Sequence, residues 1–267
     1  MTALQNVFGL KREPFSGDLK VSELFKLPQL HALLDRFEYA VANRMISVII
    51  GDVGSGKSTS LRCATSRLHP AEYRLLSVVA TSGSLSELYR QLCIALGVDN
   101  PPSSRAYLTK TLRRLLSDIA AKKQTALLVI DEAHLLRLDV FAELHTLAQV
   151  EFDSQTLLPM ILCGQDHLVD KLLYHTSRPF ASRVLGRTRL ESLNRGEMAS
   201  YLAHHLSIAG AKPELLSEDA VTAIHQGSGG LLRRANMLAR GALMAAAREK
   251  CLLVTAEHVR LASTEIL

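Results

Sequence analysis

The sequence of 267 residues contains no tryptophan, and aromatic residues make up only 5% of it. Proteins that bind unpaired nucleic acid usually stack bases on aromatic side chains, so this scarcity argues against such a surface. No apolar run reaches the roughly 18 residues that a membrane-spanning helix needs. Lys11, Arg12 and Glu13 stand where a signal peptide would have its apolar core. We therefore expect a cytoplasmic protein with no membrane partner.

Cysteine is also sparse, and its spacing excludes two kinds of site. The four cysteines are Cys63, Cys93, Cys163 and Cys251. No two of them show the close spacing that zinc sites or small disulfide frameworks require. We expect them to be small buried side chains in a reducing compartment.

Positive charge is in excess, with a formal net charge of +5 and a pI near 9.1. This balance favours a polyanionic partner, although nucleotide sites are basic too. Because aromatic residues are few, the backbone of duplex DNA is a better candidate than single strands. The apolar fraction of 48% and the length permit one large domain or two smaller ones.

The most informative stretch is ISVIIGDVGSGKST, residues 46–59, where an apolar run meets a glycine-rich loop and a helix-forming run. Its Gly51, Gly56, Lys57 and Ser58 fit G-x-x-x-x-G-K-[ST], the phosphate-binding loop of nucleotidases. Glycines allow several backbone N–H groups to face one anion, and the helix start adds its dipole. The expected ATP-binding residues are Gly51, Asp52, Val53, Gly54, Ser55, Gly56, Lys57, Ser58 and Thr59.

A second buried stretch, ALLVIDE, ends in the carboxylates Asp131 and Glu132. Chemistry in parallel sheets gathers where strands end, so these carboxylates are expected beside the phosphate loop. We assign Mg²⁺ binding to Asp131 and Ser58, and the role of general base toward water to Glu132. His134, two residues later, is expected to be an ordinary polar residue below the site, because no metal-ligating partner accompanies it.

The remaining pattern predicts an α/β unit followed by an all-α unit. Buried strands are expected at residues 73–80 and 158–165, the second presenting Gln165 to orient water or sense the γ-phosphate, or only to end the strand. Helices of the α/β unit are expected from Leu30 and at residues 85–96, 105–122 and 139–150. Helices of the all-α unit are expected at residues 195–209, 217–226, 230–248 and 255–264.

Two further stretches leave alternatives open. FGLKREPF, residues 8–15, either packs on the main core or forms a lip over the adenine. Residues 178–195 hold five arginines, which would repel one another unless negative charge lies nearby. A basic helix carrying Arg113 and Arg114, and the loop at residues 81–84, are candidates for facing DNA.

Three of these stretches, FGLKREPF, RVLGRTRLESL (residues 183–193) and GGLLRRANML (residues 229–238), resemble segments of the ExeA-like group of AAA+ ATPases. That group has F-G-L-x-x-x-P-F, Q-R-[IV]-x-x-R-[YF]-x-L-x-P-L and G-G-x-P-R-x-I-N in the same order. The resemblance covers nearly the whole chain. Ser182, Leu232 and Ala235 depart from the pattern, and Ser182 puts the choice of arginine finger in question.

The resemblance implies an α/β fold, an AAA+ P-loop NTPase with a parallel sheet of order 5-1-4-3-2 flanked by helices and followed by a small all-α lid. It divides the chain into an N-terminal segment near the adenine (residues 1–29), the nucleotide-binding domain (30–194) and the lid (195–267). Gln165 takes the sensor 1 position and Arg233 the sensor 2 position. Arg183, or else Arg187, is the arginine finger sent into a neighbouring subunit's site.

The implied activity is ATP hydrolysis with Mg²⁺ by a homo-oligomer, either a ring or a helical filament. Secretion-pathway members of the group also carry a membrane span and a cell-wall-binding domain, neither of which we expect in a chain ending at Leu267. Together with the basic charge balance, this favours the branch of the resemblance that is similar to the Mu target-selection ATPase and related transposon ATPases. The favoured function is that of a transposition helper, which assembles on duplex DNA and recruits or stimulates a transposase or integrase-type protein. Alternatives are a secretion accessory that assembles an envelope complex, and a scaffold with structural ATP and little turnover.

Overall fold

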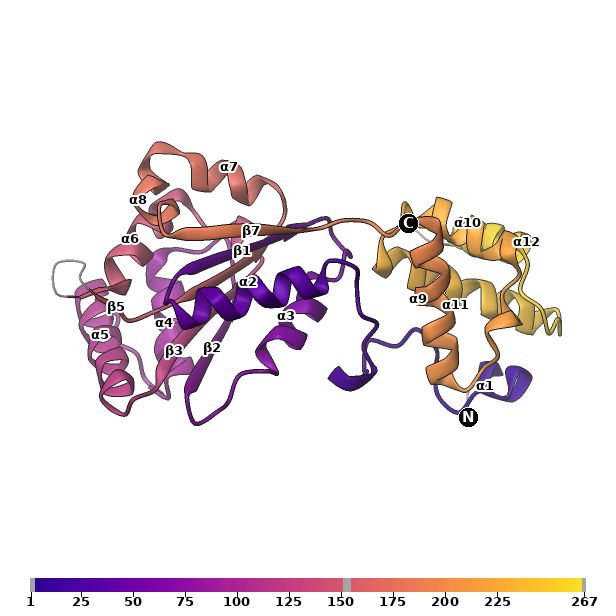
Figure 1. Ribbon diagram of the computed structural model, residues 1–267, viewed down its shortest axis with the longest axis horizontal. Helices are drawn as coiled ribbons and strands as arrows, with labels where there is room; N and C mark the ends of the chain where they lie inside the picture. Colours follow the sequence, from indigo (N-terminus) through magenta and orange to yellow (C-terminus); the bar gives the residue numbers. More distant parts are fainter. Residues whose placement is uncertain (1–2, 151–154, 266–267) are drawn as a thin grey trace. The chain divides into compact units, whose positions relative to one another are not determined.

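The computed structural model describes residues 3–150 and 155–265, and Figure 1 shows their ribbon. The described chain forms two compact units. One, here called the α/β unit, contains Pro28–Gly51 and Lys57–Leu190. The other, the helical unit, contains Met1–Leu27, Asp52–Gly56 and Glu191–Leu267. Residues 1–2 and 266–267, the ends of the first and last expected regions, lie outside the described residues.

The α/β unit is built on a five-stranded sheet of order β2-β3-β6-β1-β7. Its strands are β1 (Ile46–Gly51), β2 (Tyr73–Val79), β3 (Thr125–Asp131), β6 (Met160–Gly164) and β7 (Val184–Leu190). All neighbouring pairs are parallel. Numbered among these five strands alone the order is 2-3-4-1-5, which confirms the expected 5-1-4-3-2 parallel sheet. Two short strands, β4 (Gln149–Val150) and β5 (Gln155–Thr156), form a separate antiparallel pair.

Helices cover both faces of the sheet because its central strands are buried on both sides (Figure 1). Val48, Ile130 and Leu162 point to one face and pack with the helices that follow β2, β3 and β6. These helices are α4 (Leu85–Ala95), α5 (Arg105–Ala121), α6 (Leu138–Ala148), α7 (His167–Leu173) and α8 (Arg178–Ala181). Ile49 and Ile161 point to the other face, which α2 (Leu30–Ala42) and α3 (Lys57–Thr65) cover.

The two outer strands differ from the sequence-based expectation. Residues 73–80 were expected to be a buried strand; the strand is present as β2, but its burial was predicted wrongly, because Leu76 is buried whereas Leu75 and Val79 are 41% and 61% exposed. The reason is that β2 lies at the sheet edge and pairs only with β3. The opposite outer strand, β7, lies within the arginine-rich stretch and alternates exposed arginines with buried Thr188 and Leu190.

The helical unit packs four helices together with the short α1 (Ala3–Phe8). The four are α9 (Arg195–Ala209), α10 (Glu218–Ser228), α11 (Leu232–Arg248) and α12 (Ala256–Glu265). Asn194 and Glu197 form a capping box at the start of α9, satisfying two backbone N–H groups. Short 3-10 helices occur in both units: η1 (Val21–Glu23) and η4 (Pro213–Leu215) in the helical unit, and η2 (Ala133–Leu135) and η3 (His175–Ser177) in the α/β unit.

The N-terminal aromatic segment packs on this helical unit. Phe15 is only 3% exposed and stacks on His205 of α9, with ring centroids 5.5 Å apart. The Lys11 backbone N–H donates to the Ala209 carbonyl at 2.8 Å. Burial lowers the pKa of His205 to about 4, so the ring is neutral in this apolar contact. The role of the segment as an adenine lip stays a prediction.

Among the described helices, none combines the length and the apolar character that crossing a membrane would demand.

Two adjacent glycines make a test of the junction between α10 and α11. Both have positive φ, 59° at Gly229 and 77° at Gly230. A Cβ on Gly230 would lie 2.3 Å from the Leu193 carbonyl oxygen, whereas one on Gly229 would meet no atom within 4 Å. We expect Gly229→Ala to lower the free energy of unfolding by about 1 kcal/mol through backbone strain. Gly230→Ala should cost about 1–3 kcal/mol more because the carbonyl must move.

Chemical denaturation of the two variants measures this difference. An equal decrease in the free energy of unfolding for both variants would show that the Leu193 carbonyl moves without an energetic cost.

Candidate active site

The phosphate loop connects β1 to α3, as its sequence predicts. Gly54 and Gly56 have φ of 86° and 99°, a region that residues with a Cβ rarely adopt. Lys57 is 6% exposed, and its Nζ donates to the Gly51 carbonyl at 2.9 Å, so its ammonium group lies back over the loop. Of the other predicted residues, Ser55 is buried and Asp52, Val53, Ser58 and Thr59 are exposed.

Arg233, the predicted sensor 2 residue, lies at the start of α11 against the tip of this loop. Its backbone N–H donates to the Gly54 carbonyl at 3.2 Å. A Cβ on Gly54 would lie 2.8 Å from the Cβ of Arg233. Gly54 is therefore needed for close approach as well as for its φ.

Ser58 and Asp131, the predicted Mg²⁺ ligands, meet in the α/β unit. The Ser58 hydroxyl donates to Asp131 Oδ2 at 2.8 Å. Asp131 Oδ1 accepts the Glu132 backbone N–H at 2.9 Å, which fixes the carboxylate. A hydroxyl and a carboxylate are oxygen donors of the kind Mg²⁺ prefers, so the donor set fits this ion.

Cys163, which sequence reasoning treated only as a small buried residue, lies beside Asp131. It is fully buried on β6, next to β3 in the sheet. Burial raises the pKa of its thiol, and the Asp131 carboxylate raises it further. The side chain is thus a neutral thiol against the predicted metal ligand. Only the sheet order, which sequence periodicity does not reveal, brings the two together.

Glu132, the predicted general base, lies just past the end of β3. Its φ and ψ are 53° and 31°, a left-handed conformation that costs a non-glycine residue of the order of 1 kcal/mol or more. The turn starts η2, in which the Leu135 N–H donates to the Glu132 carbonyl at 2.8 Å. The Glu132 side chain stays 41% exposed, so its carboxylate is accessible to water.

His134 lies between Glu132 and Gln165, a role the sequence did not indicate. Its Nδ1 is 3.3 Å from Glu132 Oε2, and its Nε2 is 3.2 Å from the Gln165 side-chain amide. The ring is 4% exposed. Burial lowers the pKa of His134 and the nearby His167 lowers it further, so the ring is neutral at pH 7. Sequence reasoning placed His134 below the site but missed both contacts.

The structure does not bring the arginine candidates to the carboxyl-terminal ends of the strands, where the other site residues lie. Arg183 lies where β7 begins, and its carbonyl accepts the N–H of Ile46, the first residue of β1. Its guanidinium donates to Thr156 Oγ1 at 3.1 Å. Because the strands are parallel, Arg183 lies at the amino-terminal end of the sheet, whereas Asp131 and Gln165 lie at its carboxyl-terminal end. Arg187 is exposed in the middle of β7.

Acidic partners relieve part of the arginine repulsion. Arg189 forms an ion pair with Asp166 at 2.8 Å, and Arg195 one with Glu218 at 3.7 Å.

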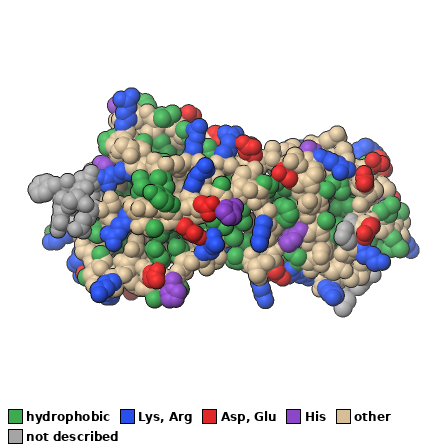
Figure 2. Space-filling view, viewed as in Figure 1, with side chains coloured by type: hydrophobic (Ala, Val, Ile, Leu, Met, Phe, Trp, Pro, Cys, Tyr) green, Lys and Arg blue, Asp and Glu red, His purple; other side chains and the backbone are tan. Residues whose placement is uncertain are grey.

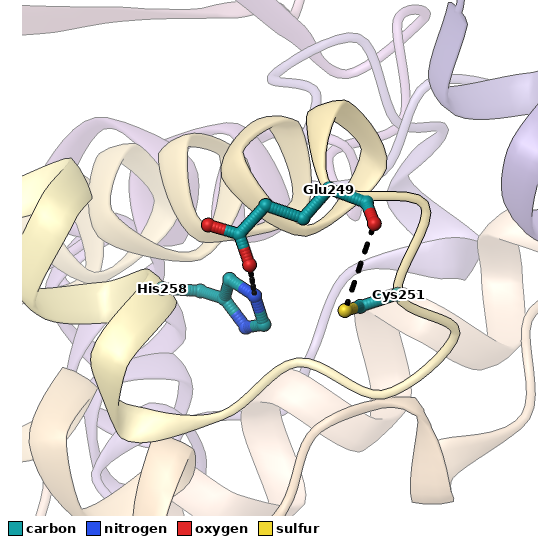
Figure 3. A group of neighbouring side chains, drawn as sticks. All are labelled: Glu249, Cys251 and His258. Atoms are coloured by element: carbon teal, nitrogen blue, oxygen red, sulfur yellow. Dashed lines mark hydrogen bonds and ion pairs between the residues drawn. The ribbon is translucent and has the colours of Figure 1, made fainter.

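A second cluster of ligand-type side chains, outside the predicted site, joins Glu249, Cys251 and His258 (Figure 3). Hydrogen bonding accounts for the position of the histidine. His258 Nδ1 accepts the Thr255 N–H at 2.9 Å, so Nε2 carries the proton and donates to Glu249 Oε2 at 3.1 Å. His258 thereby closes the first turn of α12, as a glutamate does in a capping box. Neither ring nitrogen is left with a lone pair for a metal.

Comparison with known proteins agrees with this architecture. Residues 41–172, just under half of the chain, match the AAA domain family. A curated relative, general secretion pathway protein A of Aeromonas hydrophila, is 28% identical over 242 residues. That match covers 90% of this chain and 44% of the relative, so the chain spans less than half of the relative's length.

Solved structures with the same fold are more distant in sequence. Cdc6p of Pyrobaculum aerophilum is 17% identical with a TM-score of 0.76, and the match covers 98% of this chain and 71% of that one. The ORC1 protein of Aeropyrum pernix, solved in complex with DNA, is 18% identical with a TM-score of 0.67 over 94% and 68% of the two chains. The AAA domain match includes the phosphate loop, Asp131 and Gln165, and the solved structures share the fold of the chain, so together they support an ATPase.

Replacement of the loop lysine tests this site. We expect Lys57→Ala to weaken the binding of a fluorescent ATP analogue by about 100-fold or more, because a buried cation facing the phosphates is lost. Lys122→Ala, which removes an exposed lysine at the end of α5, is the matched control and should bind normally. Normal binding by Lys57→Ala would place the nucleotide elsewhere.

Proposed function

We propose that this protein is an ATP-driven assembly factor that forms a ring or helical filament on duplex DNA and recruits or stimulates a transposase. The observation that carries the catalytic part is the grouping of Ser58, Asp131, Glu132 and Gln165 around the ends of β3 and β6. These residues provide metal ligands, a base and a polar amide, which are the parts that phosphoryl transfer to water requires.

Each of these groups has a distinct chemical role. Lys57 holds the terminal phosphates through its positive charge. Ser58 and Asp131 would hold Mg²⁺, which when bound neutralises charge on the phosphate oxygens. Glu132 accepts a proton from the attacking water, and Gln165 orients that water or the γ-phosphate.

Arg183 supports assembly into a homo-oligomer. Its position at the amino-terminal end of the sheet keeps it out of the site of its own α/β unit. A guanidinium at that end can instead complete the site of a neighbouring copy, where an arginine finger is worth about 10³–10⁵ in rate. ATP would then bridge two copies, and its hydrolysis would weaken the bridge.

Duplex DNA is the proposed partner because of the basic charge of the chain and the fold it shares with the ORC1 protein that was solved with DNA. Figure 2 shows Lys and Arg side chains spread over the visible face among acidic ones. Arg113 and Arg114 of α5 are both exposed, but the Arg113 guanidinium already donates to the Thr146 carbonyl. We therefore favour Arg114 and the loop at residues 81–84 for phosphate contact. The transposase is the partner that the resemblance to transposon ATPases implies.

A soluble accessory role in a secretion pathway is the second candidate, favoured by the 28% identity to general secretion pathway protein A. In this role the assembled ATPase would act on an envelope complex. Co-sedimentation with cell-wall or membrane material, independent of DNA, would select it over the first proposal.

DNA binding should depend on both nucleotide and salt. We expect the protein to bind duplex DNA with a non-hydrolysable ATP analogue and to lose affinity steeply as salt rises, because phosphate contacts release counterions. Fluorescence anisotropy with labelled duplex measures both effects, and Lys57→Ala should bind weakly. The DNA part of the proposal would be rejected if no binding is seen, or if the affinity for duplex DNA does not depend on nucleotide or on salt concentration.

Mixing two inactive variants tests the finger. Glu132→Gln should bind ATP without hydrolysing it, and Arg183→Ala should lose about 10³–10⁵ in rate when assembled. In an equal mixture, about a quarter of the interfaces join an intact base to an intact finger, so turnover should return. Arg187→Ala replaces Arg183→Ala in the parallel experiment. No recovery with either arginine variant would exclude both as fingers, and tight ATP without turnover in the wild type would favour the scaffold.

A further inference from the structure

The His134 ring has more hydrogen-bonding neighbours than its two nitrogens can satisfy at once. Nδ1 is 3.3 Å from both Glu132 Oε2 and the Gln165 backbone N–H. The carboxylate requires a proton on Nδ1, whereas the N–H requires a lone pair there. Nε2 faces the Gln165 side chain, whose amide can donate or accept.

We propose that His134 is a positioning residue that couples the orientation of the Gln165 amide to the release of Glu132. In the first arrangement Nδ1–H donates to Glu132, and Nε2 accepts from the Gln165 amide nitrogen. In the second, Nε2–H donates to the Gln165 amide oxygen, and Nδ1 accepts the Gln165 backbone N–H. Glu132 then has no donor from the ring and is free to bind water.

The coupling rests on the proposed function and gives it a sequence of events. A γ-phosphate is an acceptor, so it would draw the amide nitrogen of Gln165 toward itself and turn the amide oxygen toward His134. This favours the proton on Nε2, and Glu132 is released when the γ-phosphate is in place. The ring only exchanges one N–H proton between its two nitrogens, so its net charge is unchanged.

The surroundings of His134 hold the ring where this exchange is possible. Lys171 of α7 donates to the carbonyls of His134 and Leu136 at 2.6 and 2.7 Å. The His167 ring packs edge-on at 4.5 Å. A Cβ on Gly164 would lie 3.1 Å from the His134 backbone nitrogen and 3.3 Å from its Nδ1. Because Gly164 has no Cβ, the His134 imidazole can approach the backbone just before Gln165.

Kinetics give the first test. His134→Ala should lower kcat by about 10- to 100-fold, the usual scale for misplaced catalytic groups, with little change in the dissociation constant of an ATP analogue. Gln165→Ala should also lower kcat, and the double variant should be no slower than the slower single one, because both act through one contact. An unchanged kcat for His134→Ala, or losses that multiply, would overturn the proposal.

His258→Ala is the matched control. His258 is also 4% exposed, also accepts a backbone N–H at Nδ1, and also has a glutamate beside its ring, at Nε2 where Glu132 lies at Nδ1 of His134. Its loss should lower stability and leave kcat unchanged. Equal loss of kcat in both variants would mean that removing a buried histidine acts only through folding.

The ¹⁵N chemical shifts of the His134 ring give a readout that needs no turnover. We expect the proton on Nδ1 in the nucleotide-free protein and on Nε2 with a non-hydrolysable ATP analogue, with His134→Asn used for assignment. The same tautomer in both samples, or Nε2–H without nucleotide, would overturn the coupling. If the wild type binds the analogue but never hydrolyses ATP, the proposed function fails while this readout still judges the His134 contacts.

Discussion

The parallel pairing of β1, β3 and β6 is the constraint on which the candidate site depends. Register places Ile50 beside Gly164 and Ile130 beside Leu162, so the three strands end together at one edge. The phosphate loop, Asp131 and Gln165 follow these ends directly. Burial of the central strands on both faces holds this register, because a shift by one residue would exchange the side chains that pack against the two helix layers.

Backbone strain and hydrogen bonds then set the positions of the side chains that follow these strands. The left-handed conformation of Glu132 turns the chain at the strand end and brings His134 back to Gln165. A residue in this conformation persists only when its surroundings hold it. Here Lys171 holds the following carbonyls, and Asp131 accepts the Glu132 N–H. The geometry of the base is thus a property of several elements, not of the Asp-Glu pair alone.

Much of this could be predicted from the sequence because strong local signals coincide with strand ends. The phosphate loop and the strand before Asp131 carry such signals, and the predicted sheet order was confirmed. The sequence did not predict the exposed face of β2, since an apolar strand at an edge reads like a central one. It also missed the contacts of Cys163 and His134, because they depend on the register of β3 against β6 and on the turn at Glu132, which the order of the strands does not give.

The edge position of β2 has a consequence for handling the protein. On the side away from β3 its main-chain N–H and C=O groups have no neighbouring strand among the described residues, and Leu75 and Val79 add apolar surface on one face. Open edges of this kind recruit extended segments of other polypeptides. We therefore expect this margin to favour aggregation in concentrated samples, and the exposed Arg74 side chain places a positive charge there that opposes pairing of two copies.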